Sequence, residues 1–383
     1  MFYQLPPVGN PVCLSGNSQQ EFWYQSGFSS WHPHYFASGT AALAAAISAV
    51  LNSRDIDQPE VILPAYGCPD LVSAVVFAGA RPVLVDMEPD RPWMDLEQLS
   101  ASMSPRTVAI VAANLFGISE RMGKLRPIAE HAGVVLIEDS AQAFPGGRET
   151  SIWEGDLVVL SFGRGKPVSL LGGGAVLFRD AAWKDQLPEC NIRPGIGKGQ
   201  RFSFWLKMAL YNWMISPRLY WLPQSLPFLH LGETRYHTLP VIDAMDPLRL
   251  DVLPANIAAY RSDDMGTQRA LVSMVRELDL TTKGIIDLPQ VCKAPESRRL
   301  LRYPLLMDAA SRDLLYQQLQ RHGLGPSGMY PVALPRIPGL ERLLDGQGPF
   351  PAAEAFAARI LTLPTHNGVR HADVVKIRTI LGP

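Results

Sequence analysis

Short apolar runs rich in Val and Ile recur through the first half of the 383-residue chain. They lack the polar alternation of strands that are buried on one face only. The runs are Val61-Ile-Leu-Pro, Pro82-Val-Leu-Val-Asp, Val108-Ala-Ile-Val-Ala, Val134-Val-Leu-Ile-Glu-Asp and Leu157-Val-Val-Leu-Ser-Phe. This pattern is typical of parallel strands that are covered on both faces.

Helical patterns separate these runs. They cover residues 40–51, 70–78 and 122–132, and Gly79 and Gly133 stand where two of the helices should end. Alternation of strand and helix over residues 38–178 predicts an α/β domain, with a mostly parallel central sheet flanked by helices.

The pattern changes after about residue 180. Residues 188–245 hold many prolines, and helical patterns then cover 251–277, 311–322, 352–361 and 372–381, around short apolar runs at 302–307 and 326–331. We therefore predict a large domain over residues 1–245, including an aromatic-rich insert at 200–245. A smaller α+β domain should cover residues 246–383.

Composition excludes several classes of protein. With 47% hydrophobic residues and 19% charged residues, the chain is not intrinsically disordered. The net charge is −1, from 35 Lys and Arg against 36 Asp and Glu, which disfavours a nucleic-acid-binding protein. Four scattered cysteines predict neither a disulfide scaffold nor a structural zinc site, and we expect no bound metal.

No targeting or membrane-spanning segment is predicted. The N-terminal residues lack the basic and apolar regions of a secretory signal. The most apolar stretch, residues 202–231, is interrupted by Lys207, Pro217, Arg218 and Pro223. We expect a soluble cytoplasmic protein.

Residues suited to cofactor chemistry follow the predicted strand ends, where open parallel sheets bind ligands. Gly39 and Thr40 begin a helix, whose free N–H groups suit a phosphate. Lys166 follows the strand that ends at Ser161, and a lysine there suits Schiff-base chemistry. Asp139 ends another strand, and its carboxylate could pair with the ring nitrogen of pyridoxal phosphate.

Each of these residues also has an ordinary structural explanation. Asp139 could cap a helix, Lys166 could be a solvated surface lysine, and Gly172-Gly-Gly could be a tight turn. A P-loop is excluded, because Leu160 stands at its first glycine position and Pro167 where Ser or Thr is required.

The order and spacing of these motifs resemble the DegT/DnrJ/EryC1/StrS family of pyridoxal-phosphate sugar aminotransferases, which have the fold-type I architecture. The resemblance runs through Ser38-Gly-Thr-Ala-Ala-Leu, Val61-Ile-Leu-Pro-Ala-Tyr, Ala78-Gly-Ala-Arg-Pro-Val-Leu-Val-Asp, Asn114-Leu-Phe-Gly, Ile137-Glu-Asp-Ser-Ala-Gln-Ala, Ser161-Phe-x-x-x-Lys166, Gly173-Gly-Ala-Val and Leu363-Pro-Thr-His-Asn-Gly. It covers nearly the whole chain in the same order.

The resemblance implies pyridoxal 5'-phosphate as cofactor and a role for each matching residue. Lys166 would form the Schiff base with the cofactor and later move the proton, and Asp139 would hold the ring nitrogen protonated. Gln142 would contact the ring hydroxyl. The phosphate would be held by Gly39, Thr40 and Ser161. A homodimer is implied as well.

The sequence departs from the family pattern at several of these positions. Cys68 stands where the family usually has an aromatic residue against the cofactor ring. The family's Asn-Tyr-Arg segment, which reaches the partner subunit's phosphate site, reads Pro247-Leu248-Arg249, so only Arg249 is retained. Two usual histidines are replaced by Asn114 and Phe144.

The insert is rich in aromatic residues, namely Phe202, Phe204, Trp205, Tyr211, Trp213, Tyr220, Trp221 and Phe228. One interpretation is additional core or dimer-interface packing. The other is a surface over residues 200–231 for a lipid-linked or carrier-bound substrate, or for a membrane. Arg193, Lys198, Arg201 and Arg336 are candidate contacts for a diphosphate, with surface ion pairs as the ordinary alternative.

The resulting hypothesis is an aminotransferase that moves an amino group, implied to come from L-glutamate, to a keto or aldehyde group of a nucleotide-linked sugar. Related dehydratases have histidine at the lysine position, so Lys166 favours transamination. Two alternatives stay open: the same chemistry on a lipid- or carrier-linked carbonyl, and a cofactor-binding regulatory homologue without turnover.

Overall fold

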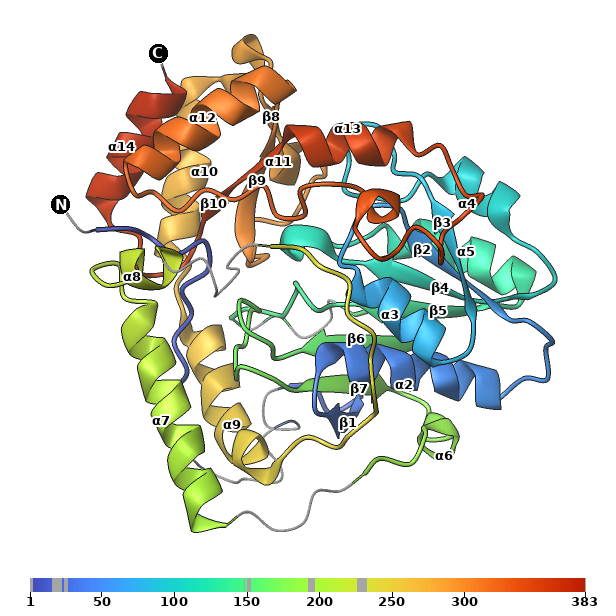
Figure 1. The fold of residues 1–383 in the computed structure, drawn as a ribbon. Coiled ribbons are helices and arrows are strands. Elements are labelled where there is room, and N and C mark those ends of the chain that lie inside the picture. The colour runs from blue at the N-terminus through green and yellow to red at the C-terminus, as the bar shows by residue number, and fades with distance from the viewer. Residues whose placement is uncertain are drawn as a thin grey trace.

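The computed structural model describes residues 3–15, 23, 27–147, 149, 153–191, 197–225 and 233–382. Its main sheet has seven strands in the order β1-β7-β6-β5-β4-β2-β3 (Figure 1). The strands are β1 (His32–Phe36), β2 (Glu60–Pro64), β3 (Arg81–Val85), β4 (Thr107–Ala113), β5 (Val135–Asp139), β6 (Leu157–Ser161) and β7 (Gly174–Phe178).

The central part of this sheet is parallel, as the apolar runs predict. Strands β2 to β6 pair in parallel, whereas β7 is antiparallel to both β6 and β1. Every residue of β2 and of β4 is buried. The sequence pattern did not predict β1, which is an edge strand of the sheet and pairs antiparallel with β7.

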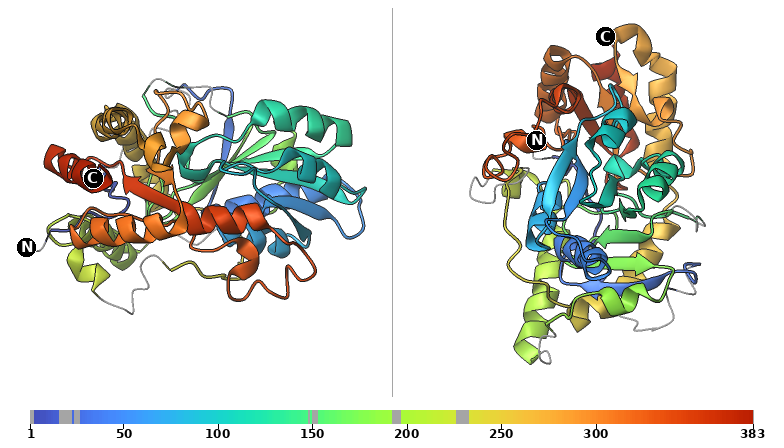
Figure 2. Two further views of the ribbon diagram at one scale, coloured as in Figure 1. Left: turned by 90° about the horizontal axis from the view of Figure 1, so that it is seen from above. Right: turned by 90° about the vertical axis from the view of Figure 1, so that its right-hand side faces the viewer.

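Helices cover both faces of this sheet (Figure 2). Val61 and Leu63 of β2 pack in one apolar cluster with α2 (Gly39–Asn52) and α3 (Asp70–Phe77). Ile62 points to the opposite face, where it joins a cluster with α4 (Leu96–Ser102) and α5 (Met122–Ala132). Successive side chains of a strand point to opposite faces, so a fully apolar strand needs both layers.

The C-terminal part contains a second sheet, antiparallel, in the order β10-β9-β8. Its strands are β8 (Ile286–Asp287), β9 (Arg302–Leu306) and β10 (Ile360–Pro364). The remaining helices are α6 (Trp183–Gln186), α7 (Lys198–Met214), α8 (Trp221–Gln224), α9 (Pro247–Ser262), α10 (Gly266–Leu278), α11 (Leu288–Val291), α12 (Ala309–Arg321), α13 (Pro351–Arg359) and α14 (His371–Leu381), with 3-10 turns η1 (Leu115–Gly117), η3 (Leu280–Lys283) and η4 (Leu334–Arg336).

The division after residue 245 stays a prediction. The helix that follows it, α9, buries Leu248, Val252 and Ile257 in the same cluster as residues of β6 and β7. This helix therefore packs on the large sheet, although it lies in the predicted small domain.

Two predicted helix boundaries and one predicted strand are wrong. The pattern over 251–277 is two helices, because Asp263 accepts a hydrogen bond from the Met265 backbone, which has a φ of 56° there. The pattern over 352–361 ends in the first residues of β10. The run at 326–331 makes only an isolated bridge, from Ser327 to Thr362.

In the part of the chain that the structure describes, no helix has both the length and the apolar composition needed to cross a membrane.

Candidate active site

A cavity of about 260 Å³ opens where β4, β5 and β6 end and α2 begins. Seven of the eight predicted site residues line it, namely Gly39, Thr40, Cys68, Asp139, Gln142, Ser161 and Lys166. The structure thus brings together residues that lie as far as 127 positions apart in the sequence, from Gly39 to Lys166.

One end of the cavity is formed by the first turn of α2. The Ser38 side chain caps this helix by accepting a hydrogen bond from the backbone of Ala41, at 3.0 Å. The first N–H groups of a helix have no acceptor within the helix, and they carry the positive end of its dipole. A Cβ atom at Gly39 would lie 2.6 Å from the Ser161 side chain, so glycine is needed for this close approach.

These groups fit a phosphate. The backbone N–H groups at Gly39 and Thr40 and the hydroxyl groups of Thr40 and Ser161 are the donors that such an anion requires. Their close packing leaves a cradle that a side chain at residue 39 would fill.

Asp139 ends β5 inside the cavity. One carboxylate oxygen accepts a hydrogen bond from the Ala141 backbone, at 2.9 Å. Burial raises the pKa of Asp139, while the nearby Lys166 and the Ala141 N–H act in the opposite direction. In the described part of the chain, the second oxygen has no hydrogen-bond partner that would keep it from a cationic ring nitrogen. This free acceptor fits the N–H group of a protonated pyridine ring.

A buried polar network holds the strand end behind Asp139. The Asn114 amide donates hydrogen bonds to Glu138 and to Ser140, both at 2.8 Å. Glu138 also accepts from the backbone of Glu154 and Gly155. Asn114 replaces the family histidine, so the structure gives this departure a positioning role next to β5.

Lys166 lies on the loop between β6 and β7. Its backbone N–H donates to the Gly163 carbonyl at 3.3 Å, and Gly165 between them has a φ of 74°, which favours glycine. This turn brings Lys166 into the same cavity as Asp139.

Gln142 is held by two protein groups. Its side-chain oxygen accepts from the Phe116 backbone, and its nitrogen donates to the Tyr330 hydroxyl, both at 2.9 Å. The expected contact between Gln142 and the ring hydroxyl therefore stays a prediction. Burial raises the pKa of Tyr330 well above its ordinary value, so this hydroxyl stays protonated.

The sequence-based prediction missed three ionisable residues of the cavity wall, namely Asp70, Arg164 and Tyr330. Asp70 follows Cys68 by two positions, and Arg164 lies inside the Ser161–Lys166 motif, so both could have been considered. Tyr330 comes from a distant loop that carries no site pattern of its own. Its position depends on packing against the buried Tyr66, with ring centroids 5.7 Å apart.

Cys68 lines the cavity as a neutral thiol. Burial, together with the neighbouring Asp70, raises its pKa to about 12, although Lys166 acts in the opposite direction. At this position the family usually has an aromatic ring, and the structure provides a small, uncharged and weakly polar side chain instead.

Arg249 is not part of the described cavity wall. Its guanidinium donates to the Leu170 carbonyl at 3.1 Å and pairs with Asp246. It also packs beside Gly172, where a Cβ atom would lie 3.1 Å from its Nε. Arg249 therefore holds the loop that follows Lys166, and its predicted phosphate contact stays a prediction.

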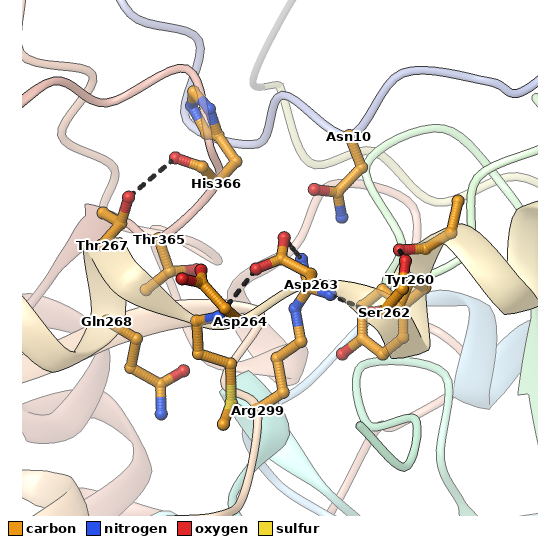
Figure 3. A network of polar contacts seen from close by, with 12 residues as sticks. Asn10, Tyr260, Ser262, Asp263, Asp264, Thr267, Gln268, Arg299, Thr365 and His366 are labelled. Atoms are coloured by element: carbon orange, nitrogen blue, oxygen red, sulfur yellow. Dashed lines mark hydrogen bonds and ion pairs between the residues drawn. The ribbon is translucent and has the colours of Figure 1, made fainter. Parts of the chain in front are cut away.

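A second cavity, of about 470 Å³, lies on the other side of the same loop. Pro167, Val168 and Ser169 form part of its wall, together with residues from the N-terminal segment, the end of α7, α9 and the loop after β10. Figure 3 shows two of its wall residues, Asn10 and His366, above the ion pair between Asp263 and Arg299.

The charges around the second cavity are compensated. Arg299 and Asp263 are both nearly buried and lie 2.6 Å apart. His366 uses both ring nitrogens, on the Pro6 carbonyl and the Gly368 N–H, and burial lowers its pKa to about 4. The wall therefore presents neutral amide and hydroxyl groups to a ligand.

Other predicted features lie away from both cavities or outside the described residues. Arg336 pairs with Glu354 at 2.9 Å, which is the ordinary alternative for this arginine. Lys198 and Arg201 lie exposed on α7. Arg193 and Phe228 fall outside the described residues. Among the described residues, His, Cys, Asp and Glu form no group of three that could bind a metal ion.

Comparison with known proteins agrees with this geometry. A dTDP-3-amino-3,4,6-trideoxy-alpha-D-glucose transaminase of Micromonospora megalomicea is 35% identical over 338 residues, which cover 87% of this chain and 80% of the relative. A UDP-2-acetamido-2-deoxy-3-oxo-D-glucuronate aminotransferase of Pseudomonas aeruginosa is 26% identical, over 84% of this chain and 77% of the relative.

Solved structures show the same fold. The S. venezuelae protein DesV, solved in complex with a ketimine intermediate, matches with a TM-score of 0.71 and 21% identity, over 96% of this chain and 89% of that chain. The fold-type I architecture is therefore confirmed. Residues 19–215 and 263–381 match one family description. The chain belongs to the DegT/DnrJ/EryC1/StrS aminotransferase family.

Proposed function

We propose that this protein is a pyridoxal-phosphate-dependent aminotransferase that transfers an amino group from L-glutamate to a keto or aldehyde group of a nucleotide-linked sugar. The observation that carries the proposal is the first cavity. It brings a lysine amine, a half-buried carboxylate and the N-terminus of α2 into one cavity.

Each group has a distinct task in this chemistry. When bound, pyridoxal phosphate supplies an electron sink that stabilises negative charge at the substrate carbon. The Asp139 carboxylate would keep the ring nitrogen protonated. The Lys166 amine would bind the cofactor, leave when the donor arrives, and then carry the proton. Gly39, Thr40 and Ser161 would hold the phosphate.

The nucleotide-sugar acceptor is supported by the relatives, which are named for UDP- and dTDP-linked sugars. We assign the neutral part of the acceptor to the second cavity. The polar side chains of its wall that remain available to a ligand are uncharged, and Asn367 is one of them. The wall also includes Pro167, the residue directly after Lys166. A sugar ring or a nucleoside is the ligand class that such a surface can bind.

The first experiment is the visible absorption spectrum of the protein with pyridoxal phosphate, before and after addition of L-glutamate. We expect a band from the lysine-bound cofactor, which glutamate converts to the amino form of the cofactor. Lys166→Ala should lack the lysine-bound band, whereas Lys124→Ala, an exposed lysine of α5, should keep it. Absence of cofactor binding would overturn the assignment.

The acceptor is tested next, with UDP- and dTDP-linked keto sugars and measurement of the 2-oxo acid released from glutamate. Asn367→Ala should raise the acceptor KM about 2- to 10-fold, the effect of one lost hydrogen bond, and leave the glutamate KM unchanged. Asn52→Ala, at the end of α2, is the matched control.

Two alternatives remain as outcomes of these tests. A lipid- or carrier-linked carbonyl would be the acceptor if nucleotide sugars fail while glutamate still converts the cofactor. A regulatory homologue without turnover would bind the cofactor and leave it unconverted by any amino donor. The absence of a ring-facing aromatic residue at Cys68 is the observation that favours this second alternative.

A further inference from the structure

Helix α7 (Lys198–Met214) has two apolar faces. One face buries Phe204 and Met208 against the cluster that contains β6 and β7. The other face carries four large side chains that are 70%, 55%, 48% and 54% exposed, in the order Phe202, Leu206, Leu210 and Trp213. We call these four residues the α7 stripe.

The α7 stripe is continuous. Its members follow one another at spacings of four, four and three residues, which places them on one side of a helix. At 1.5 Å per residue, the stripe is roughly 16 Å long. In the described part of the chain nine large hydrophobic side chains are exposed, and four of them belong to this stripe. Contiguous exposed apolar surface marks an interaction site, whereas single exposed residues do not.

The surroundings of the α7 stripe are basic. Residues 197–225 contain Lys198, Arg201, Lys207 and Arg218 and no Asp or Glu, in a chain whose net charge is −1. All four basic residues are exposed. Within the described part of the chain, none of the four forms an ion pair. This region therefore carries four basic side chains without an ion pair, three of them on α7 itself.

The stripe lies at the outside of the molecule. Figures 1 and 2 show α7 along an outer edge, with only its inner side against the rest of the protein. A flat partner could therefore contact the helix along its length.

We propose that α7 is an in-plane membrane-binding helix, which inserts the α7 stripe into a bilayer surface that carries anionic lipids. Phe, Leu and Trp on one side of a helix, with Lys and Arg at its borders, are the composition that such helices use. Lys198 lies one turn before Phe202, and Lys207 follows Leu206, so both amines could reach lipid headgroups while the stripe is buried.

Charge disfavours the simplest other occupant of this surface, a second copy of the chain. A twofold contact of stripe against stripe would bring two clusters of like charge together. Negatively charged headgroups would instead compensate the lysines and arginines. This proposal does not depend on the acceptor or on the cofactor.

The test is co-sedimentation of the full-length protein, loaded with pyridoxal phosphate, with vesicles of phosphatidylcholine or of equal parts phosphatidylcholine and phosphatidylglycerol. We expect binding to the phosphatidylglycerol vesicles only, weakened by salt. Phe202→Ser with Trp213→Ser should reduce partitioning at least about tenfold. Lys198→Gln and Lys207→Gln should each reduce it about fivefold.

Matched controls are Phe77→Ser and Leu314→Ser, two exposed apolar residues on other elements, which should bind as the unchanged protein does. Light scattering of each variant gives its mass, and circular dichroism confirms its folding. The proposal is overturned if phosphatidylglycerol vesicles do not bind the protein, or if the stripe variants bind as well as the controls. It is also overturned if light scattering shows that the stripe variants dissociate an oligomer while their binding to vesicles is unchanged.

Discussion

The two cavities on either side of the Lys166 loop differ in how their charges are balanced. In the first, Asp70, Asp139, Arg164 and Lys166 line one wall, and the described part of the chain contains no ion pair among them. In the second, Arg299 and Asp263 neutralise each other and His366 is neutral. Unpaired charges are suited to proton transfer and to holding an ionic cofactor, whereas a compensated wall is suited to recognition of a neutral ligand.

The largest effect expected from this comparison concerns Lys166 in the first cavity. Lys166→Ala should lower turnover by at least about 10² to 10⁴-fold, the usual effect of removing a positioned proton-transfer group. Cofactor binding should persist, because the phosphate donors and Asp139 are unchanged. Steady-state kinetics with glutamate, with Lys124→Ala as the control, measure the loss. If turnover of Lys166→Ala stayed within tenfold of the unchanged enzyme, the first cavity would not be the catalytic site.

Charge compensation at the second cavity is tested by Arg299→Leu. The variant leaves Asp263 buried without its partner and should cost about 3–5 kcal/mol of unfolding free energy. Arg269→Leu is the control, because its pair with Asp264 is exposed and should be worth at most about 1 kcal/mol. Urea unfolding measures both. Equal losses in the two variants would show that the Asp263–Arg299 pair is no more important than a surface pair.

The neutral His366 predicts a pH dependence. Burial lowers its pKa from 6.5 to about 4. Between pH 6.5 and pH 4, therefore, His366 is protonated in the unfolded chain and neutral in the folded protein. Stability from this group is complete above pH 6.5 and is lost as pH falls toward 4, by about 3 kcal/mol. Urea midpoints at pH 7.5, 6 and 5 should fall less steeply in His366→Asn. Parallel slopes in both proteins would contradict this assignment.

The smallest expected effect sharpens the role of Cys68. Cys68→Tyr adds an aromatic ring to the wall of the first cavity, and stacking against the cofactor should tighten its binding by about 0.5–1.5 kcal/mol. Cys68→Ala, which removes the thiol without adding a ring, should give no gain. Titration of the protein with pyridoxal phosphate measures both. Weaker binding in Cys68→Tyr would mean that this position does not face the ring.

The strands could be predicted because apolar runs are local, and much of the first cavity could be predicted because a parallel sheet brings the ends of its strands to one edge. Val61 to Leu63 form a strand that is buried on both faces because each residue is apolar. Asp139 and Ser161 are the last residues of β5 and β6, and Lys166 lies on the loop after β6. Tyr330 could not be predicted, because its place depends on a hydrogen bond with Gln142, 188 residues away. Similarly, the wall of the second cavity combines Asn10, Pro167 and Asn367, which no pattern along the chain connects.

The helix boundary at Asp263 was missed for a different reason. The apolar spacing continues through residues 251–277, and periodicity alone does not register a turn between two helices. The turn is stabilised by Asp263, which accepts from the Met265 backbone and also pairs with Arg299 from a distant segment. The role of Asp263 in ending the helix becomes visible only when the three-dimensional positions of Met265 and Arg299 are known.

The segment from Lys166 to Ser169 is a partition between the two cavities, with the lysine on one side and the next three residues on the other. A ligand that presses on Pro167 to Ser169 therefore acts on the backbone that carries the Lys166 amine. If Lys166 binds pyridoxal phosphate as proposed, the absorbance of the bound cofactor should depend on the geometry of that linkage, and so should report what occupies the neighbouring cavity. Ligands of the second cavity could then be ranked with a spectrophotometer before any product is measured.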